Sequence, residues 1–147
     1  MLAILVAVLL GFRPAAARAQ DVPSRQVTVF GILADPNDPT VDDKLKPIAP
    51  QLRRLFPGHG FKLLGSETRR ISQGQTVICD FGGGYEAGAQ LMTPYDANGK
   101  TQLRFQLDKD GSIDFARLVS TPTNQLFFLD KRLPDSTRLI IGIGARE

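Results

Sequence analysis

The sequence predicts a mainly β protein: an antiparallel β-sandwich or partly open barrel of about seven or eight strands, with one short α-helix near the amino terminus. Short runs rich in β-branched and aromatic residues recur along most of the chain, separated by turns rich in Gly, Pro, Asn and Asp. Only one segment has apolar residues at helical spacing. Residues 101–107 alternate strictly between polar and apolar, the pattern of a strand with one buried face.

The first residues are predicted to be a cleavable signal peptide and not part of the fold. Residues 2–12 form an apolar run about half as long as the ~20 residues that a membrane-spanning helix needs. Ala17-Arg18-Ala19 then matches the A-x-A pattern of a signal peptidase site. We therefore expect a signal peptide at residues 1–19, cut after Ala19, and a single secreted or periplasmic β-rich domain at residues 20–147. The alternative is a buried amino-terminal helix, which the polar stretch that follows disfavours.

Composition narrows the class of partner. Loss of Arg13 and Arg18 with the signal peptide leaves 16 of the 18 basic residues against 15 acidic ones, a net charge of about +1. A nearly neutral domain lacks the basic surface that nucleic-acid binding requires, so no nucleic-acid partner is expected. No membrane span is expected in the mature chain.

Cys79, the only cysteine, lies in an apolar stretch and is expected to be buried and inert, with an intermolecular disulfide or a reactive thiol as alternatives.

The first elements are a strand and a helix. Residues 26–34 are predicted to be a largely buried strand, which ends in a loop with two prolines. Apolar residues between Leu45 and Phe56 recur at three- and four-residue spacing, which places them on one helical face. Because proline is tolerated only in a first turn, we expect the helix to begin near Pro47, after an irregular lead-in turn at residues 42–46. It should cover one end of the sandwich or an open edge.

Strands and turns make up the rest of the chain. The expected strands span residues 61–71, 75–81, 85–93, 101–107, 113–120, 125–131 and 138–145. Asp110-Gly111, between two of them, is typical of a two-residue hairpin turn.

The acidic residues around this turn, Asp108, Asp110 and Asp114, resemble the centre of an EF-hand loop. Aligning Gly111 with the sixth position of such a loop places Arg117 at the twelfth, where calcium requires a bidentate carboxylate. A cation at that position repels the metal, so the hairpin turn is favoured. A weak calcium site built from the three aspartates is the alternative.

No other motif predicts a catalytic, cofactor-binding or metal-binding residue. Gly82-Gly83-Gly84 lacks the spacing and the following helix of a phosphate-binding loop, so a β-turn is expected. His59, the only histidine, has no companions at zinc-ligand spacing. Carboxylates for glycoside cleavage pair in space, so a hydrolase is an alternative. Most lie in turns, where aspartate ordinarily serves the backbone; these are Asp35, Asp38, Asp42, Asp43, Asp96 and Asp135.

Aromatic side chains give little sign of a sugar-stacking platform. The chain has no tryptophan and only two tyrosines, and most of its phenylalanines lie inside apolar strands. Phe127-Phe128 projects one ring to each face of its strand. Burial on both faces is favoured, and exposure of one ring, as a contact surface, is the alternative.

Four segments carry a resemblance, namely Lys44-Leu45, Leu52–Phe56, Phe61–Gly65 and Leu139–Ile143. On these residues the chain resembles a group of small secreted bacterial β-rich proteins of uncharacterised function. The resemblance implies an envelope or secreted β domain and carries no catalytic or binding residues. The aspartates between Asp108 and Asp114 replace a plainer turn in such proteins.

These observations favour a non-catalytic binding or assembly module. Its expected partner is an envelope protein or surface component, contacted through a sheet edge or through loops. A secreted hydrolase using loop carboxylates and a purely structural envelope domain are the alternatives.

Overall fold

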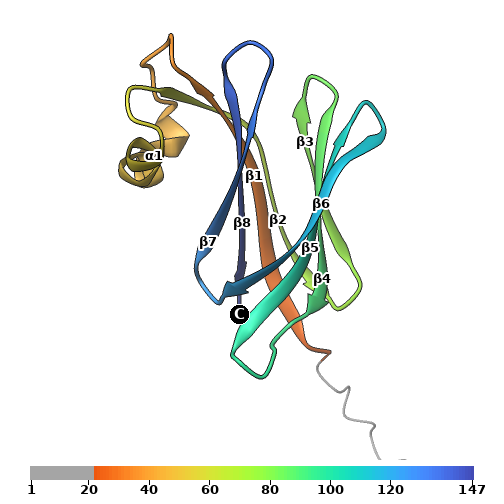
Figure 1. Ribbon diagram of the computed structural model, residues 1–147. Helices are drawn as coiled ribbons and strands as arrows, with labels where there is room; N and C mark the ends of the chain where they lie inside the picture. Colours follow the sequence, from red (N-terminus) through yellow and green to blue (C-terminus); the bar gives the residue numbers. More distant parts are fainter. Residues whose placement is uncertain (1–21) are drawn as a thin grey trace, which may run out of the picture.

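The computed structural model describes residues 22–147, so the expected signal peptide lies outside the described residues. The described part of the chain contains eight strands, one 3₁₀ helix (η1) and one short α-helix (Figure 1). In chain order these are β1 (Ser24–Asp35), η1 (Asp43–Ile48), α1 (Ala49–Leu55), β2 (Gly60–Ser72), β3 (Thr76–Gly82), β4 (Tyr85–Thr93), β5 (Lys100–Lys109), β6 (Ser112–Pro122), β7 (Leu126–Arg132) and β8 (Arg138–Arg146).

The strands form two antiparallel sheets that pack face to face. Sheet A has the strand order β2-β1-β8-β7, and sheet B has the order β3-β4-β5-β6. Figure 1 shows sheet A with α1 beside it and sheet B facing it. The predicted β-sandwich is therefore confirmed, and across the described strands the two sheets do not close into a barrel.

The main hydrophobic core lies between the two sheets. Each strand of sheet B sends alternate side chains inward, so Leu103, Phe105 and Leu107 of β5 are fully buried. From sheet A, β1 and β8 contribute the inward-facing residues Val27, Val29 and Ile141, among others. The alternation predicted for residues 101–107 is confirmed, because it assigns the apolar side chains of β5 to this core.

A second, smaller core lies on the outer face of sheet A. Here Ile32 of β1 and Ile140 of β8 point away from sheet B and pack under Leu45 of η1 and Leu52 of α1. The central strands of sheet A are therefore apolar on both faces, which explains why residues 26–34 form a nearly continuous apolar run. The expectation that the helix covers one end or an open edge is wrong, since it covers part of this outer face.

The helix begins within two residues of the predicted start, but the segment that leads into it differs from the prediction. A 3₁₀ turn extends through Ile48, and α1 begins at Ala49, two residues after Pro47. Pro50 then occupies the first turn of α1, where the missing N–H leaves no hydrogen bond unmade. Pro47 lies inside the 3₁₀ segment, so the lead-in is a regular turn and not an irregular one.

The edge strands of the two sheets lie close together on one side of the sandwich and farther apart on the other. On one side β2 lies so close to β3 that a Cβ on Gly65 would meet the backbone oxygen of Asp80 at 2.5 Å. On the other side a groove of about 540 Å³ separates β6 from β7, and the ion pair between Asp114 and Lys131 crosses it. No helix within residues 22–147 is long and apolar enough to cross a membrane.

Candidate functional site: the outer face of sheet B

The outer face of sheet B carries a regular grid of mostly polar side chains. Antiparallel pairing places residues of β3, β4 and β5 directly opposite one another, so their side chains form rows across the sheet. The three rows are Asp80–Glu86–Asp108, Ile78–Gly88–Gln106 and Thr76–Gln90–Arg104.

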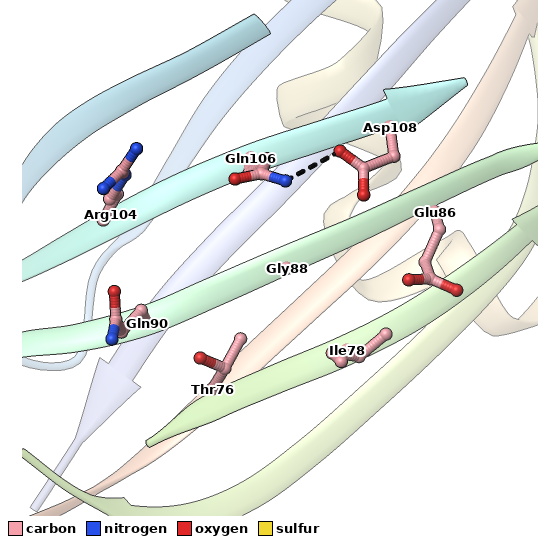
Figure 2. Close-up of a pocket in the computed structure, with 8 residues that line it drawn as sticks. All are labelled: Thr76, Ile78, Glu86, Gly88, Gln90, Arg104, Gln106 and Asp108. Atoms are coloured by element: carbon pink, nitrogen blue, oxygen red, sulfur yellow. Dashed lines mark hydrogen bonds between the residues drawn. The ribbon is translucent and has the colours of Figure 1, made fainter. Parts of the chain in front are cut away.

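Gly88 leaves a gap at the middle of this grid. The surrounding side chains enclose a hollow of about 230 Å³ above it, and Figure 2 shows these side chains around Gly88. A Cβ on Gly88 would make only ordinary contact with Thr76 Cγ2, at 3.5 Å, so a larger side chain here would extend into the hollow. The floor of the hollow is therefore backbone, which a ligand can approach closely.

The acidic row lies along one side of the hollow. Like charges directly opposite each other in a sheet are destabilising, so three carboxylates in one row oppose stability unless they are solvated or paired. Gln106 Nε2 donates to Asp108 Oδ1 at 2.8 Å, and the Gly82 N–H donates to Asp80 Oδ1 at 2.8 Å. Glu86, between them, makes no side-chain hydrogen bond or ion pair within residues 22–147.

Arg104 lies on the other side of the hollow from the acidic row. It forms no hydrogen bond or ion pair with any residue that the structure describes, and its side chain is exposed. Figure 2 shows Arg104 and Gln90 at one end of the hollow and Glu86 and Asp108 at the other, with Gln106 and Gly88 between them. A free guanidinium group and a free carboxylate therefore remain available to a bound molecule.

The three aspartates of the calcium alternative point to different places. Asp108 lines the hollow on the outer face, and Asp110 is at the tip of the β5–β6 turn. Asp114 faces β7 and forms the ion pair with Lys131. Nowhere in residues 22–147 do three His, Cys, Asp or Glu side chains come close enough together to hold a metal ion. The hairpin turn itself is confirmed, with Asp110 and Gly111 both at positive φ, 51° and 82°.

The glycine run forms the turn between β3 and β4. All three glycines have positive φ, which is the conformation of a tight turn. Carboxylates of Asp80, Glu86, Asp108 and Asp110 line the neighbouring depression. A phosphate group would be repelled there, so the structure agrees with a β-turn.

Most of the loop aspartates hold their own loops. Each accepts a hydrogen bond from the backbone N–H two residues later, as Asp35 does from Asn37 at 2.8 Å and Asp96 from Asn98 at 2.8 Å. The same bond forms at Asp38, Asp42 and Asp135. Asp43 instead forms an exposed ion pair with Lys46 at 2.9 Å. All of these carboxylates except that of Asp43 therefore serve the backbone, and they are distributed over several loops.

The remaining candidates lie away from the grid. His59 Nδ1 donates to the backbone oxygen of Pro57 at 3.1 Å, and its ring packs on Phe56.

Cys79 is buried in the main core, where burial and the nearby carboxylates of Glu67 and Asp80 raise the pKa of its thiol to about 11. Such a thiol stays protonated at neutral pH, which agrees with the inert role predicted for it.

Phe127 and Phe128 are half-buried on opposite faces of β7. Phe127 packs against the main core and Phe128 against the second core, where its ring meets Phe30 edge-on at 6.1 Å. Neither ring is fully exposed. The structure is therefore close to the burial on both faces of the strand that the sequence favoured.

Sequence reasoning identified the alternation on β5 but missed the hollow. The polar positions of residues 75–81, 85–93 and 101–107 were visible in the sequence. What could not be read there is the register that places Gly88 between Ile78 and Gln106. A glycine within a strand was the available signal, because it marks a close approach of backbone.

Comparison with known proteins adds no relative: no family model, curated protein or solved structure matches this chain.

Proposed function

We propose that this protein is a non-catalytic binding module that acts outside the cytoplasm, in the periplasm or after secretion, and that the hollow around Gly88 is its ligand site. The observation that carries the proposal is a ring of hydrogen-bonding side chains around a residue that has no side chain. An envelope location rests on the predicted signal peptide at residues 1–19.

The chemistry of the ring favours a ligand rich in hydroxyl groups. The Thr76 hydroxyl and the amides of Gln90 and Gln106 can each donate and accept, whereas Arg104 only donates and ionised Glu86 only accepts. A sugar hydroxyl also donates and accepts, so a glycan can satisfy this mixed set. We therefore propose a polysaccharide or glycan of the cell surface as the ligand.

Ile78 adds an apolar contact at the same site. Its side chain is 55% exposed beside the hollow, although an isoleucine within a sheet is usually buried. It can contact the C–H face of a sugar ring. The residues that line the hollow include no aromatic ring, so affinity would come from hydrogen bonds spread over several sugar units.

Binding is favoured over hydrolysis by the openness of the site. Enzymes that cleave glycosidic bonds enclose the reacting bond and exclude bulk water. The hollow opens on the outer face of a sheet, and the loop aspartates hold turns elsewhere. A second, catalytic function has no comparable support.

A binding experiment tests the proposal. The purified protein is titrated with soluble peptidoglycan fragments and with neutral and acidic hexose oligomers, while backbone amide chemical shifts are followed by NMR. We expect shifts confined to β3, β4 and β5. Gly88→Gln, which fills the hollow, should abolish them, and Arg104→Ala should weaken binding about tenfold, as expected for one lost charged hydrogen bond.

Ser120→Gln is the matched control, because it adds the same side chain to an exposed position of sheet B outside the hollow. Binding unchanged by Gly88→Gln would contradict the proposal, as would no binding to any of these glycans. Release of shorter sugars that Glu86→Gln or Asp108→Ala prevents would establish the hydrolase instead.

A further inference from the structure

The edge strand β6 is unusual in its exposed apolar side chains. Ile113 is 63% exposed and Leu118 is 61% exposed, both on the outer face of sheet B. Free strand edges invite pairing with another chain, and proteins commonly protect them with charges or proline. Among the described strands, β7 carries three successive charged residues, Asp130 to Arg132, and β2 lies against β3. In β6 the only proline is Pro122, its last residue.

A bulge makes the exposed face of β6 symmetric. Along β5, Ala116 lies opposite Gln106, and the pairs two residues away on either side are Arg104–Leu118 and Asp108–Ile113. Asp114 is the extra residue of the bulge and has no partner on β5. As a result the β5 partners of Leu118 and Ile113 are each two positions from the partner of Ala116, one on each side.

We propose that two copies of this protein pair through β6, antiparallel and in a register centred on Ala116. The two B sheets would then form one continuous eight-stranded sheet with a twofold axis at Ala116. With Asp114 left out of the ladder between the copies, as it is in the pairing with β5, Leu118 of each copy lies opposite Ile113 of the other. The two exposed apolar side chains therefore cover each other twice, once on each side of the axis.

The charges of the strand match in the same register. Arg117 of one copy lies opposite Phe115 of the other and next to its Asp114. Within residues 22–147, Arg117 forms no ion pair, while Asp114 keeps 29% of its side chain exposed beside Lys131. Each interface thus gains two contacts between opposite charges.

This self-complementarity is why a second copy is favoured over an unrelated strand. A foreign strand could pair with the free backbone of β6, but nothing in β6 specifies its side chains. A second copy supplies apolar opposite apolar and basic beside acidic, through a single register. The pairing does not depend on what the hollow around Gly88 binds.

Charge substitutions at the two apolar positions test the pairing. The purified protein should sediment as a species of twice the mass of one chain. The double variant Ile113→Lys with Leu118→Lys places lysine opposite lysine and should weaken association by about 100-fold. The double variant Ile113→Asp with Leu118→Lys changes the same two positions but places aspartate opposite lysine, and it should remain a dimer.

Leu55→Lys is the control, because it charges an exposed leucine on α1, away from β6, and should leave the mass unchanged. A crosslinking variant reports the register directly. Ala116→Cys should be joined to its own counterpart by a short bis-maleimide, because the two residues meet at the axis. Ser120→Cys should not be, since Ser120 lies well away from the axis. The native Cys79 is buried and should not react.

Three results would overturn the proposal. The first is a monomeric protein whose Ala116→Cys variant gives no crosslinked dimer. The second is a dimer that persists when both apolar positions carry lysine. The third is crosslinking of the Ala116→Cys variant to a chain of different mass, which would assign the edge to another partner. Should a charged variant fail to fold, the crosslinking pattern decides.

Discussion

Phe30 of β1 lies directly opposite Gly142 of β8, and its ring fills the space that a side chain at Gly142 would take. On the other side of Gly142, β7 places Phe128 directly opposite. The two aromatic rings meet edge-on over the glycine, at 6.1 Å and 77°. Gly142 and the Phe30 ring therefore form one packing unit, in which the ring covers strand backbone that would otherwise be exposed.

Replacement of Gly142 by alanine is expected to destabilise the protein. The new Cβ would lie 2.1 Å from Phe30 Cζ, so the ring would have to move out of a packed core. Overpacking of this kind costs roughly 1–3 kcal/mol. Denaturant unfolding measures the change. Gly88→Ala is the matched control, because its Cβ meets nothing nearer than 3.5 Å and should leave stability nearly unchanged. Equal effects of the two substitutions would contradict this account.

Two leucines of α1 should differ sharply in their contribution to stability. Leu52 is fully buried in the second core, whereas Leu55 is 50% exposed. Leu52→Ala should lower the free energy of unfolding by about 2–5 kcal/mol, because it removes buried methyl groups and leaves a cavity. Leu55→Ala should change it by less than about 1 kcal/mol. Thermal and denaturant unfolding of both variants check the difference, and similar values would place α1 differently on the sheet.

Those two leucines also show where sequence reasoning succeeds and fails. The helical spacing from Leu45 to Phe56 predicted one apolar face, and Leu45 and Leu52 are indeed buried. Leu55 follows the same spacing, but it lies outside the contact between α1 and the outer face of sheet A. Spacing assigns residues to a face of a helix, whereas the surface against which that face packs decides which of them are covered. That surface consists of β1, β2 and β8, whose arrangement the local sequence does not contain.

The strands could be predicted from the sequence, whereas the site could not. Alternation and turn residues depend on neighbours in the sequence, so the hairpin at Asp110-Gly111 could be read directly. The hollow depends on the register of three strands, and the groove beside β6 depends on which strands lie at the edges. Both are long-range properties. A glycine at position 88 indicates a gap only when its neighbours across the sheet are known.

The buried thiol of Cys79 predicts a decline in stability at alkaline pH. Its pKa is raised from an ordinary thiol value of 9.0 to about 11, chiefly by burial. Between these values the unfolded chain has lost the proton that the folded protein keeps, so stability falls as the pH rises through this range. Cys79→Ala should remove this part of the decline. Unfolding curves from pH 8 to pH 11 check it, and identical slopes for both proteins would contradict it.

The same residue predicts slow labelling. A buried, protonated thiol reacts poorly with disulfide reagents, because the thiolate is the reactive form. At pH 8 the native protein should therefore react much more slowly than the protein in denaturant. Fast labelling of the folded protein would show that Cys79 is accessible, against its 2% exposure.

Asp96 predicts a loss of stability on the acid side. The hydrogen bond from the Gln102 side chain, followed by that from the Lys100 backbone N–H, holds the pKa of this carboxyl below its ordinary value. Its contribution is present at neutral pH and is lost as the pH falls below about 4, the ordinary range of aspartate, toward the lower folded value. Asp96→Asn should make the melting temperature less dependent on pH below this point. A parallel acid decline in both proteins would argue against the loop as the cause.

The pairing of β1 with β8 joins the first described strand to the last, for example Val27 to Ala145. The central ladder of sheet A can therefore form only once almost the whole chain is present, and contacts this distant in sequence form slowly. Under the export proposed above, with the amino terminus leading, β1 would leave the cytoplasm first and β8 last. The central ladder of sheet A would then form only after the whole domain had crossed, so folding would be completed on the far side of the membrane.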